Sequence, residues 1–334
     1  MAEEHTDKML TDQVLRWAAG AVDGTSVVST ESLGRGGHRA SGTFRLRIEG
    51  PAARATDVIL KVPVRGWIRA VWLITNARAL QLAETHGLAA PRLIAADLDF
   101  ESSQSATSAA LAVGRASGTV ATLETFLSGS ADLPPTASDA RLREAGAALA
   151  RVHAFSMEPQ AHLPHRPRPC AVDDRADERR RGVMPTTPLL QEADERVRSH
   201  GVPAASSVFL HGDVWGGNML FEGDRCVALI DWKTAGVGNP GVDLGGLRMQ
   251  MALQYGQDAP AHVLEGWERQ AGRAAIAVPY WDAVAALNTP TDLDHAVGAP
   301  GFADDGRPLD AAAVTERRDA FLRTALDQLP TRSS

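Results

Sequence analysis

The stretch VFLHGDVWGGNMLFEGDRCVALIDWKTAGVGNPGVD, residues 208–243, is the most informative part of this chain. It places a histidine, two asparagines and four aspartates among segments such as VFL and VALI, which are typical of buried strands. A carboxylate beside a buried strand is costly unless another group pairs with it. These polar groups therefore either satisfy one another in a core or hold a cation.

The pattern within this stretch predicts how its polar residues come together. VFL predicts a short strand that ends at His211, followed by a loop from Asp213 to Asn218 with two glycines. NMLF and CVALIDW predict two strands that the turn EGDR joins into a hairpin. The hairpin returns Asp231 towards Asn218, so we expect Asp213, Asn218 and Asp231 to converge. Two of these residues can supply oxygen ligands to a hard cation such as magnesium, and the third can accept a proton.

The overall composition limits the class of protein. The chain has 334 residues, which suits two domains, and a formal net charge of −7, which disfavours a nucleic-acid partner. Its first residues, MAEEHTDKML, do not form a secretory signal, and no apolar run approaches membrane-spanning length. Two widely spaced cysteines favour a reducing compartment. We expect a cytoplasmic protein that binds neither nucleic acid nor membrane; its oligomeric state is not predicted.

The periodicity of apolar residues predicts an α+β fold. The segments FRLRIE, VILKV, PRLIAAD and AALAVGR predict strands, and we expect the first 115 residues to be mostly antiparallel sheet with one main helix. Helical spacing predicts helices at 6–20, 67–86, 136–156, 186–200, 258–272, 279–288 and 310–329. The expected domains are a sheet lobe over 1–115 and a mostly helical lobe over 116–334.

The motifs HGDVWGGN, LIDW and GNPGVDL together resemble those of the aminoglycoside phosphotransferase family, a branch of the protein-kinase-like fold that also contains choline kinases. The combination is specific, whereas any single motif is weak. The resemblance extends over most of the chain. It implies a bilobal protein-kinase-like fold. It also implies an ATP-dependent kinase that uses Mg²⁺, with GTP as an alternative nucleotide, and moves the γ-phosphate to a hydroxyl of a small molecule.

The resemblance also implies a role for each motif residue. Asp213 would be the base that accepts the proton of the acceptor hydroxyl, and Asn218 and Asp231 would hold magnesium on the ATP phosphates. His211 would brace the catalytic loop, and Asp243 would support the same loop by hydrogen bonding.

The first lobe would supply the nucleotide contacts. The lysine of VILKV would contact the phosphates, the loop GRGG would cover them with backbone N–H groups, and LAVGRA would place backbone groups beside adenine. The residues implied are Lys61, Gly34, Gly36, Gly37, Gly114 and Ala116. Taken alone, an edge lysine explains Lys61 and an ordinary hairpin turn explains GRGG.

Two residues depart from the family pattern. Asn76 stands where the family has a helix glutamate that pairs with the strand lysine, and Glu84 lies two helical turns further on. We therefore expect Lys61 to lack a charged partner and to be held by a neutral hydrogen bond. Lys233, two residues after Asp231, would compete with the cation, contact a phosphate or turn to solvent, and the last interpretation is favoured.

Two other functions remain as alternatives. A metallohydrolase would use His211, Asp213, Asp231 and Asp243 as ligands, but it leaves Asn218 unexplained. A catalytically weak pseudokinase would bind nucleotide without turnover, as the missing helix glutamate allows. ATP turnover that depends on a hydroxyl acceptor separates the kinase from the binding module, and zinc dependence without ATP would indicate the hydrolase.

The acceptor is left open, because fold does not determine substrate. Aminoglycoside, macrolide, sugar, choline-like and amino-acid hydroxyls all suit the resemblance. Acidic residues of the later helices, Asp282 among them, would suit a polycationic acceptor, and a solvated helix face explains them equally well. Trp267, Tyr280 and Trp281 could line an acceptor pocket, although buried packing is favoured for each.

Overall fold

The computed structural model describes residues 10–33, 42–51, 54–63, 66–98, 116–169, 173–293, 303–304, 307–308 and 310–330. Within these ranges the chain divides into two compact units, Met1–Ser128 and Gly129–Ser334. The predicted domain boundary after residue 115 lies outside the described residues.

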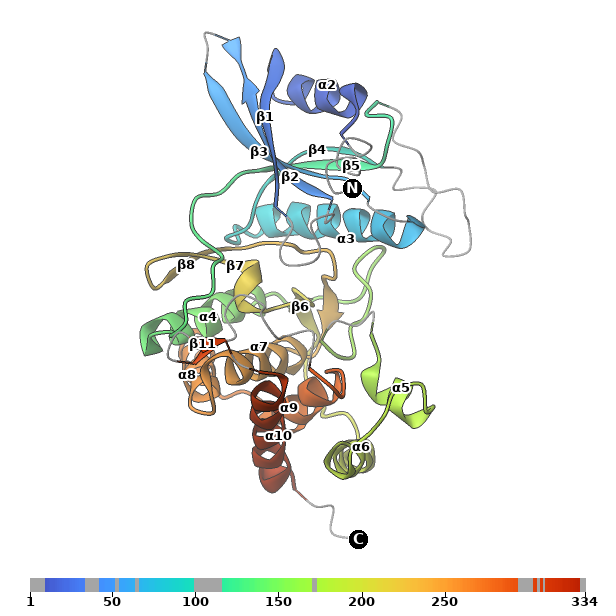
Figure 1. Ribbon diagram of the computed structural model, residues 1–334, viewed down its shortest axis with the longest axis vertical. Helices are drawn as coiled ribbons and strands as arrows, with labels where there is room; N and C mark the ends of the chain where they lie inside the picture. Colours follow the sequence, from blue (N-terminus) through green and yellow to red (C-terminus); the bar gives the residue numbers. More distant parts are fainter. Residues whose placement is uncertain are drawn as a thin grey trace. The chain divides into compact units, whose positions relative to one another are not determined.

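The first unit contains an antiparallel five-stranded sheet with the strand order β1-β2-β3-β5-β4 (Figure 1). Its strands are β1 (Ser26–Ser32), β2 (Thr43–Glu49), β3 (Ala55–Lys61), β4 (Leu93–Asp97) and β5 (Ala121–Thr125). In β2 the alternating residues Phe44, Leu46 and Ile48 are buried, as their period of two predicts. They form one hydrophobic cluster with Val14 and Ala18 of helix α2 (Asp12–Gly20).

Helix α3 (Gly66–Thr85) packs against β4 and β5. It confirms the helix predicted over 67–86. Its inner positions are occupied largely by small and apolar residues such as Ala77, Leu80 and Ala83, all fully buried. Asn76 lies among them and is also buried, so its side chain must find its hydrogen-bond partners inside the unit.

Strand β5 is not among the predicted strands. Its sequence ATLET alternates apolar Ala121 and Leu123 with polar Thr122 and Glu124, but the strand is short and the polar residues are buried as well. The strand predicted at 109–115 lies outside the described residues.

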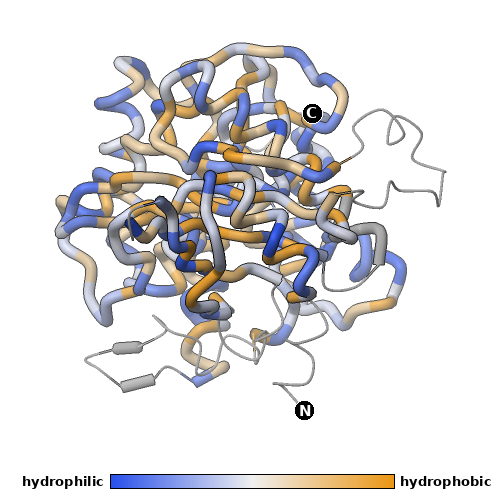
Figure 2. The backbone as a smooth tube through the Cα atoms, turned by 90° about the horizontal axis from the view of Figure 1, so that it is seen from above, coloured by the Kyte–Doolittle hydropathy of each residue, from blue (hydrophilic) through white to orange (hydrophobic). Residues whose placement is uncertain are grey.

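The second unit is mostly helical, as predicted. Its helices are α4 (Asp139–Val152), α5 (Arg175–Arg180), α6 (Pro188–His200), α7 (Gly241–Tyr255), α8 (Ala259–Ala271), α9 (Val278–Leu287) and α10 (Ala311–Gln328). Helices α6, α7, α9 and α10 share one hydrophobic core. Hydrophobic and hydrophilic residues alternate along much of the backbone (Figure 2), as expected when each element buries one side.

Helix α7 is central to this unit but is absent from the predicted helices, because GVDLGG reads as a loop. Its glycines allow close packing. A Cβ at Gly241 would clash with the indole of Trp281, and a Cβ at Gly245 would clash with the backbone of the same residue in α9. The same glycines that make this segment resemble a loop in the sequence therefore let α7 and α9 approach each other.

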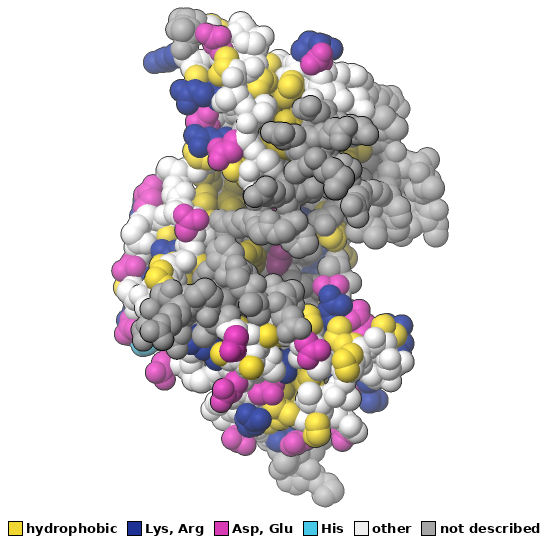
Figure 3. Space-filling model, in the orientation of Figure 1, with side chains coloured by type: hydrophobic (Ala, Val, Ile, Leu, Met, Phe, Trp, Pro, Cys, Tyr) yellow, Lys and Arg dark blue, Asp and Glu magenta, His cyan; other side chains and the backbone are white. Residues whose placement is uncertain are grey.

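Three short two-stranded sheets complete the second unit: β6 (Val208–Leu210) with β9 (Gly236–Gly238), β7 (Met219–Glu222) with β8 (Arg225–Leu229), and β10 (Ala303–Asp304) with β11 (Arg307–Pro308). On the face drawn in Figure 3, described side chains of both charge signs are interspersed. None of the described helices is long and apolar enough to cross a membrane.

Candidate active site

The loop after β6 carries the HGD motif of the second unit. The three residues of β6 are buried, and the chain leaves the strand at His211. Gly212 follows with a φ of +82°, and a Cβ there would clash with the carbonyl oxygen of Thr234. Only glycine fits both the backbone conformation and the available space. The middle residue of the motif therefore sets the path of the chain into Asp213.

Asp243, in the first turn of α7, anchors this loop. Its Oδ2 accepts the backbone N–H of His211 at 2.7 Å, and its Oδ1 accepts that of Gly212 at 2.9 Å. The carboxylate is buried, and the positive end of the helix dipole favours its charge. Two charge-assisted hydrogen bonds thus fix the loop at its start.

A second contact, which sequence reasoning missed, orients Asp243. The indole N–H of Trp267 donates to Nδ1 of His153 at 3.0 Å, and Nε2 of His153 lies 3.3 Å from Oδ2 of Asp243. Because an indole nitrogen only donates, Nδ1 of His153 accepts, so its Nε2 carries the proton and donates to the carboxylate. Sequence reasoning had no local signal for this relay, whose members lie on α8, at the end of α4 and on α7.

His211 lies inside the loop as a neutral side chain. Its Nε2 donates to the carbonyl oxygen of Ile230 at 2.9 Å, and its Nδ1 accepts the backbone N–H of Asp213 at 3.4 Å. Burial lowers its pKa, although the nearby carboxylate of Asp243 opposes this. The imidazole also packs on Trp232, with ring centroids 4.5 Å apart. One ring nitrogen thus connects the loop to the chain that follows β8, and the other forms a hydrogen bond within the loop.

The hairpin of β7 and β8 brings the other motif residues to the loop. The backbone N–H of Ile230 donates to the carbonyl oxygen of Asn218 at 2.9 Å, so the residue before Asp231 lies beside Asn218. The Asn218 side-chain amide donates to the carbonyl oxygen of Asp213 at 2.8 Å and lies 3.4 Å from its Oδ2. The structure therefore brings together Asp213, Asn218 and Asp231.

Asp231 is the second residue after the end of β8 and has a φ of +65°. Few residues other than glycine adopt this left-handed conformation, although aspartate tolerates it better than most. The strand ends at Leu229, so the carboxylate is aimed by a turn and not by the pleat of a strand.

Lys233 does not turn to solvent, so that prediction is wrong. Its ammonium lies 2.9 Å from Oδ2 of Asp213 and also forms an ion pair with Asp231. Burial alone would lower the pKa of Lys233, but the two carboxylates outweigh it and raise the pKa. This cation thus links the two acidic residues of the motif.

In the first unit, Lys61 belongs to a buried polar cluster. Its ammonium lies 3.2 Å from Oδ1 of Asn76 and 3.3 Å from Oε1 of Glu124. The amide nitrogen of Asn76 donates to the same Oε1 of Glu124 at 2.6 Å. The neutral hydrogen bond to Asn76 is present as predicted. The prediction that Lys61 lacks a charged partner is wrong, because Glu124 on β5 supplies the carboxylate.

Glu84, the other carboxylate considered for Lys61, lies elsewhere. Its side chain is about half exposed, and its carboxylate lies 3.8 Å from the guanidinium of Arg92. The wide separation of Lys61 and Glu124 in the sequence explains why spacing along α3 could not identify the partner.

The remaining predicted nucleotide contacts are only partly described. Gly34, Gly36, Gly37 and Gly114 lie outside the described residues. Ala116 is described, and both of its backbone groups contact protein atoms: its N–H donates to Oδ2 of Asp97 at 2.8 Å, and its carbonyl oxygen accepts from Gln13 at 3.2 Å.

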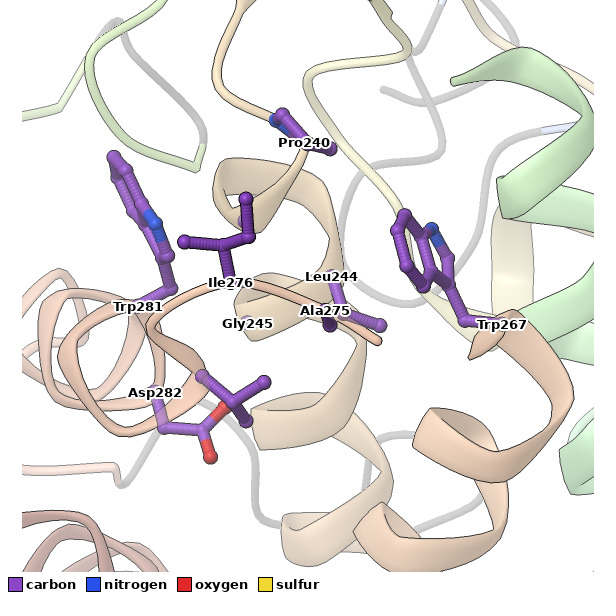
Figure 4. Close-up of a pocket in the computed structure, with 10 residues that line it drawn as sticks. Pro240, Leu244, Gly245, Trp267, Ala275, Ile276, Trp281 and Asp282 are labelled. Carbon is purple, nitrogen blue, oxygen red and sulfur yellow. The ribbon is translucent and has the colours of Figure 1, made fainter. Parts of the chain in front are cut away.

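Three aromatic residues proposed for an acceptor pocket are buried, as favoured from the sequence: Trp267, Tyr280 and Trp281. Two of them, Trp267 and Trp281, line a small apolar hollow with Leu244 and Ile276 (Figure 4). Asp282, at the edge of this hollow, forms a bidentate buried ion pair with Arg248 at 2.8–2.9 Å, so its charge is already neutralised.

Two of the four metal ligands that the metallohydrolase alternative requires, His211 and Asp243, are engaged in other contacts. His211 directs one ring nitrogen to a backbone carbonyl and the other to a backbone N–H, and Asp243 accepts two backbone N–H groups. Across the described ranges, no three His, Cys, Asp or Glu side chains are grouped in a way that could hold a metal ion.

Comparison with solved structures gives many similar folds, among them the following three. A macrolide 2'-phosphotransferase, MphH, from Brachybacterium faecium is 20% identical with a TM-score of 0.54, and the match covers 96% of this chain and 100% of that chain. The aminoglycoside phosphotransferase APH(4)-Ia, in complex with ADP and hygromycin B, is 14% identical with a TM-score of 0.55 over 90% and 95% of the two chains. The amicoumacin kinase hAmiN, in complex with AMP-PNP and Ca²⁺, is 10% identical with a TM-score of 0.58 over 98% and 96%. At these identities the likeness establishes the kinase-like fold.

Sequence comparison supplies the family. No curated protein matches the chain. The family profile described as the phosphotransferase enzyme family matches residues 36–287, about three quarters of the chain, including the HGD loop, the hairpin and Asp243. The chain therefore belongs to the phosphotransferase enzyme family.

Proposed function

We propose that this protein is an ATP-dependent kinase that phosphorylates a hydroxyl group of a small molecule. The observation that carries the proposal is the convergence of Asp213, Asn218 and Asp231 at the HGD loop and the hairpin. Phosphoryl transfer requires little covalent chemistry from a protein. It requires a positioned nucleophile and neutralisation of the charge on the phosphates.

In the proposed reaction, Asp213 accepts the proton of the acceptor hydroxyl. The hydroxyl oxygen forms a bond to the γ-phosphorus of ATP, and the bond between that phosphorus and the bridging oxygen breaks to release ADP. Asp243, His211 and the His153–Trp267 relay keep Asp213 in place by fixing the backbone of the loop. None of these supporting groups needs to contact substrate.

Asn218 and Asp231 are proposed to hold magnesium. An amide oxygen and a carboxylate are ligands that this hard cation accepts. The ion pairs of Lys233 with Asp213 and Asp231 support the fit, because they show that these carboxylates attract a positive charge. When bound, the metal would neutralise charge on the ATP phosphates.

The first unit is proposed to bind the nucleotide. Lys61 would contact the phosphates, and the backbone N–H groups of Gly34, Gly36 and Gly37 would cover them. We leave out Ala116, because its backbone groups already contact Asp97 and Gln13. GTP is an alternative nucleotide, and the acceptor class stays open among aminoglycosides, macrolides, sugars, choline-like compounds and hydroxylated amino acids.

The pseudokinase alternative rests on the absence of the helix glutamate. Glu124 weakens that argument, because Lys61 has a buried carboxylate partner after all. A measurement of acceptor-dependent ATP turnover distinguishes the kinase from the pseudokinase directly.

The proposed function is tested by measuring ADP release with Mg-ATP and a panel of these acceptor classes. We expect release to depend on one acceptor class and to disappear in Asp213→Asn, which still binds ATP. Asp224→Asn, an exposed aspartate in the turn between β7 and β8, is the matched control and should retain activity. ATP binding without acceptor-dependent release across the panel would favour the pseudokinase.

A further inference from the structure

We propose that Glu124 on β5 is the positioning carboxylate for Lys61, and that Asn76 on α3 holds the two together. In this chain the negative charge that pairs with Lys61 would then lie on a strand, whereas the family resemblance places it on the helix. The inference rests on the proposed function in one respect, namely that Lys61 contacts the phosphates of ATP.

The burial of the cluster requires a counter-charge. Lys61, Asn76 and Glu124 are 8%, 1% and 2% exposed. An ammonium at such a depth is costly unless a negative group pairs with it, and an amide oxygen alone would leave the positive charge unbalanced. Glu124, whose Oε1 lies 3.3 Å from the ammonium, brings the net charge of the cluster to zero.

Asn76 fits this role only in one orientation. Its amide oxygen accepts from the ammonium, and its amide nitrogen donates to the carboxylate. The reversed amide would place an NH₂ group against the ammonium and an oxygen against the carboxylate, so both contacts would become repulsive. A residue with one acceptor and one donor end therefore suits the position between a cation and an anion, whereas a glutamate does not.

The register of the sheet explains why Glu124 reaches Lys61. Lys61 pairs with Thr122, and Glu124 pairs with Ile59 on the neighbouring strand β3. Residues two apart on a strand point to the same face, so Glu124 stands diagonally across from Lys61 on that face. Long side chains can bridge this diagonal separation.

This arrangement has a mechanistic consequence. In protein kinases the lysine pairs with a glutamate on a helix, and movement of that helix controls the pair. Here the pair joins two hydrogen-bonded strands, and a displacement of α3 would break only the bonds of Asn76. The carboxylate partner of Lys61 is therefore built into the sheet.

Variants that move the carboxylate from position 124 to position 76 test the inference. We expect Glu124→Gln to raise the Kd and KM for Mg-ATP about tenfold, because a charged hydrogen-bond partner is lost, while kcat changes less. Asn76→Glu alone should not lower either constant, and it should lower the melting temperature, because two carboxylates then share one ammonium. The double variant Asn76→Glu/Glu124→Gln restores one carboxylate and should return the Kd for ATP towards that of the parent.

Two controls complete the design. Glu84→Gln removes an exposed carboxylate of the same helix and should leave ATP binding unchanged. In a Lys61→Ala background, Glu124→Gln should have no further effect on the Kd, since their coupling is then already lost.

The inference is overturned if Glu124→Gln binds ATP like the parent, or if the double variant binds no better than Glu124→Gln. These binding results are independent of the proposed phosphoryl transfer. A parent that binds ATP but phosphorylates no acceptor would contradict the proposed function and leave the titrations interpretable.

Discussion

The two lysine–carboxylate clusters of this protein differ in their charge balance. In the first unit, the ammonium of Lys61 lies beside the carboxylate of Glu124 and the neutral amide of Asn76. In the second unit, the ammonium of Lys233 lies beside two carboxylates, those of Asp213 and Asp231.

The exposed fraction of the side chains also differs between the two clusters. The side chains of Lys61 and Glu124 are 10% and 3% exposed, whereas those of Lys233, Asp213 and Asp231 are 26%, 20% and 34% exposed. A buried cluster that pairs an ammonium with a carboxylate can hold the lysine side chain in one orientation. A partly exposed cluster in which two carboxylates surround one ammonium is suited to take up a metal ion or a proton. The difference fits the proposed roles, positioning for the first cluster and chemistry for the second.

The largest effect is expected at the proposed base. Asp213→Asn should lower turnover by about a hundredfold or more, the usual scale for loss of a general base. ATP affinity should change little, because Asp213 is not a proposed metal ligand. Steady-state kinetics and calorimetric titration of the purified variant check both statements. Near-parental turnover in the folded variant would remove Asp213 from the reaction.

The next effect is expected at the proposed metal ligands. Asp231→Ala should weaken Mg-ATP binding by about tenfold or more, because a carboxylate ligand is lost, and Asn218→Ala should weaken it less. Titration with and without Mg²⁺ separates a metal effect from a general loss of fold. If Asp231→Ala binds Mg-ATP like the parent, its carboxylate has a structural role instead.

Lys233 offers a way to change the charge balance of the second cluster alone. Lys233→Met leaves two neighbouring carboxylates without their cation, so we expect a lower melting temperature in the absence of Mg²⁺. Added Mg²⁺ should then raise the melting temperature by more than in the parent, whereas Lys233→Arg should resemble the parent. An equal response to Mg²⁺ in all three proteins would mean that the excess charge does not attract the metal.

The smallest effect is expected at His211, whose pKa burial lowers from the ordinary value of 6.5. As the pH falls below about 6.5, the unfolded chain takes up a proton there while the folded protein keeps His211 neutral, so stability falls by up to about 1.4 kcal/mol per pH unit. Removing the imidazole, as in His211→Gln, should flatten this part of the melting-temperature profile. An unchanged slope in His211→Gln would contradict a buried neutral imidazole.

Local patterns predicted much of this structure. The strands β2, β3 and β4, the helix α3 and the hairpin that carries Asp231 follow from period-two alternation, helical spacing and the turn EGDR. The convergence of Asp213, Asn218 and Asp231 also follows, because all three lie within one short loop and hairpin.

What the sequence did not predict depends on contacts between distant segments. Glu124 lies 48 positions from Asn76, in a short strand whose polar residues are buried together with its apolar ones. His153 meets Asp243 across 90 positions. The predicted strand CVALIDW reaches Trp232, but β8 ends at Leu229, so the contacts of Lys233 with both aspartates depend on a turn that no periodicity describes.

The most direct test of the account follows the phosphoryl group itself. The parent and Asp213→Asn would be incubated with Mg²⁺, ATP labelled in its γ-phosphate and the acceptor class found active in the ADP-release panel, and the labelled products would be separated. The account predicts that the parent transfers the label to the acceptor as a phosphate ester, and that Asp213→Asn does so at least about a hundredfold more slowly. Label that appears only as inorganic phosphate, or transfer by Asp213→Asn at the parental rate, would contradict it.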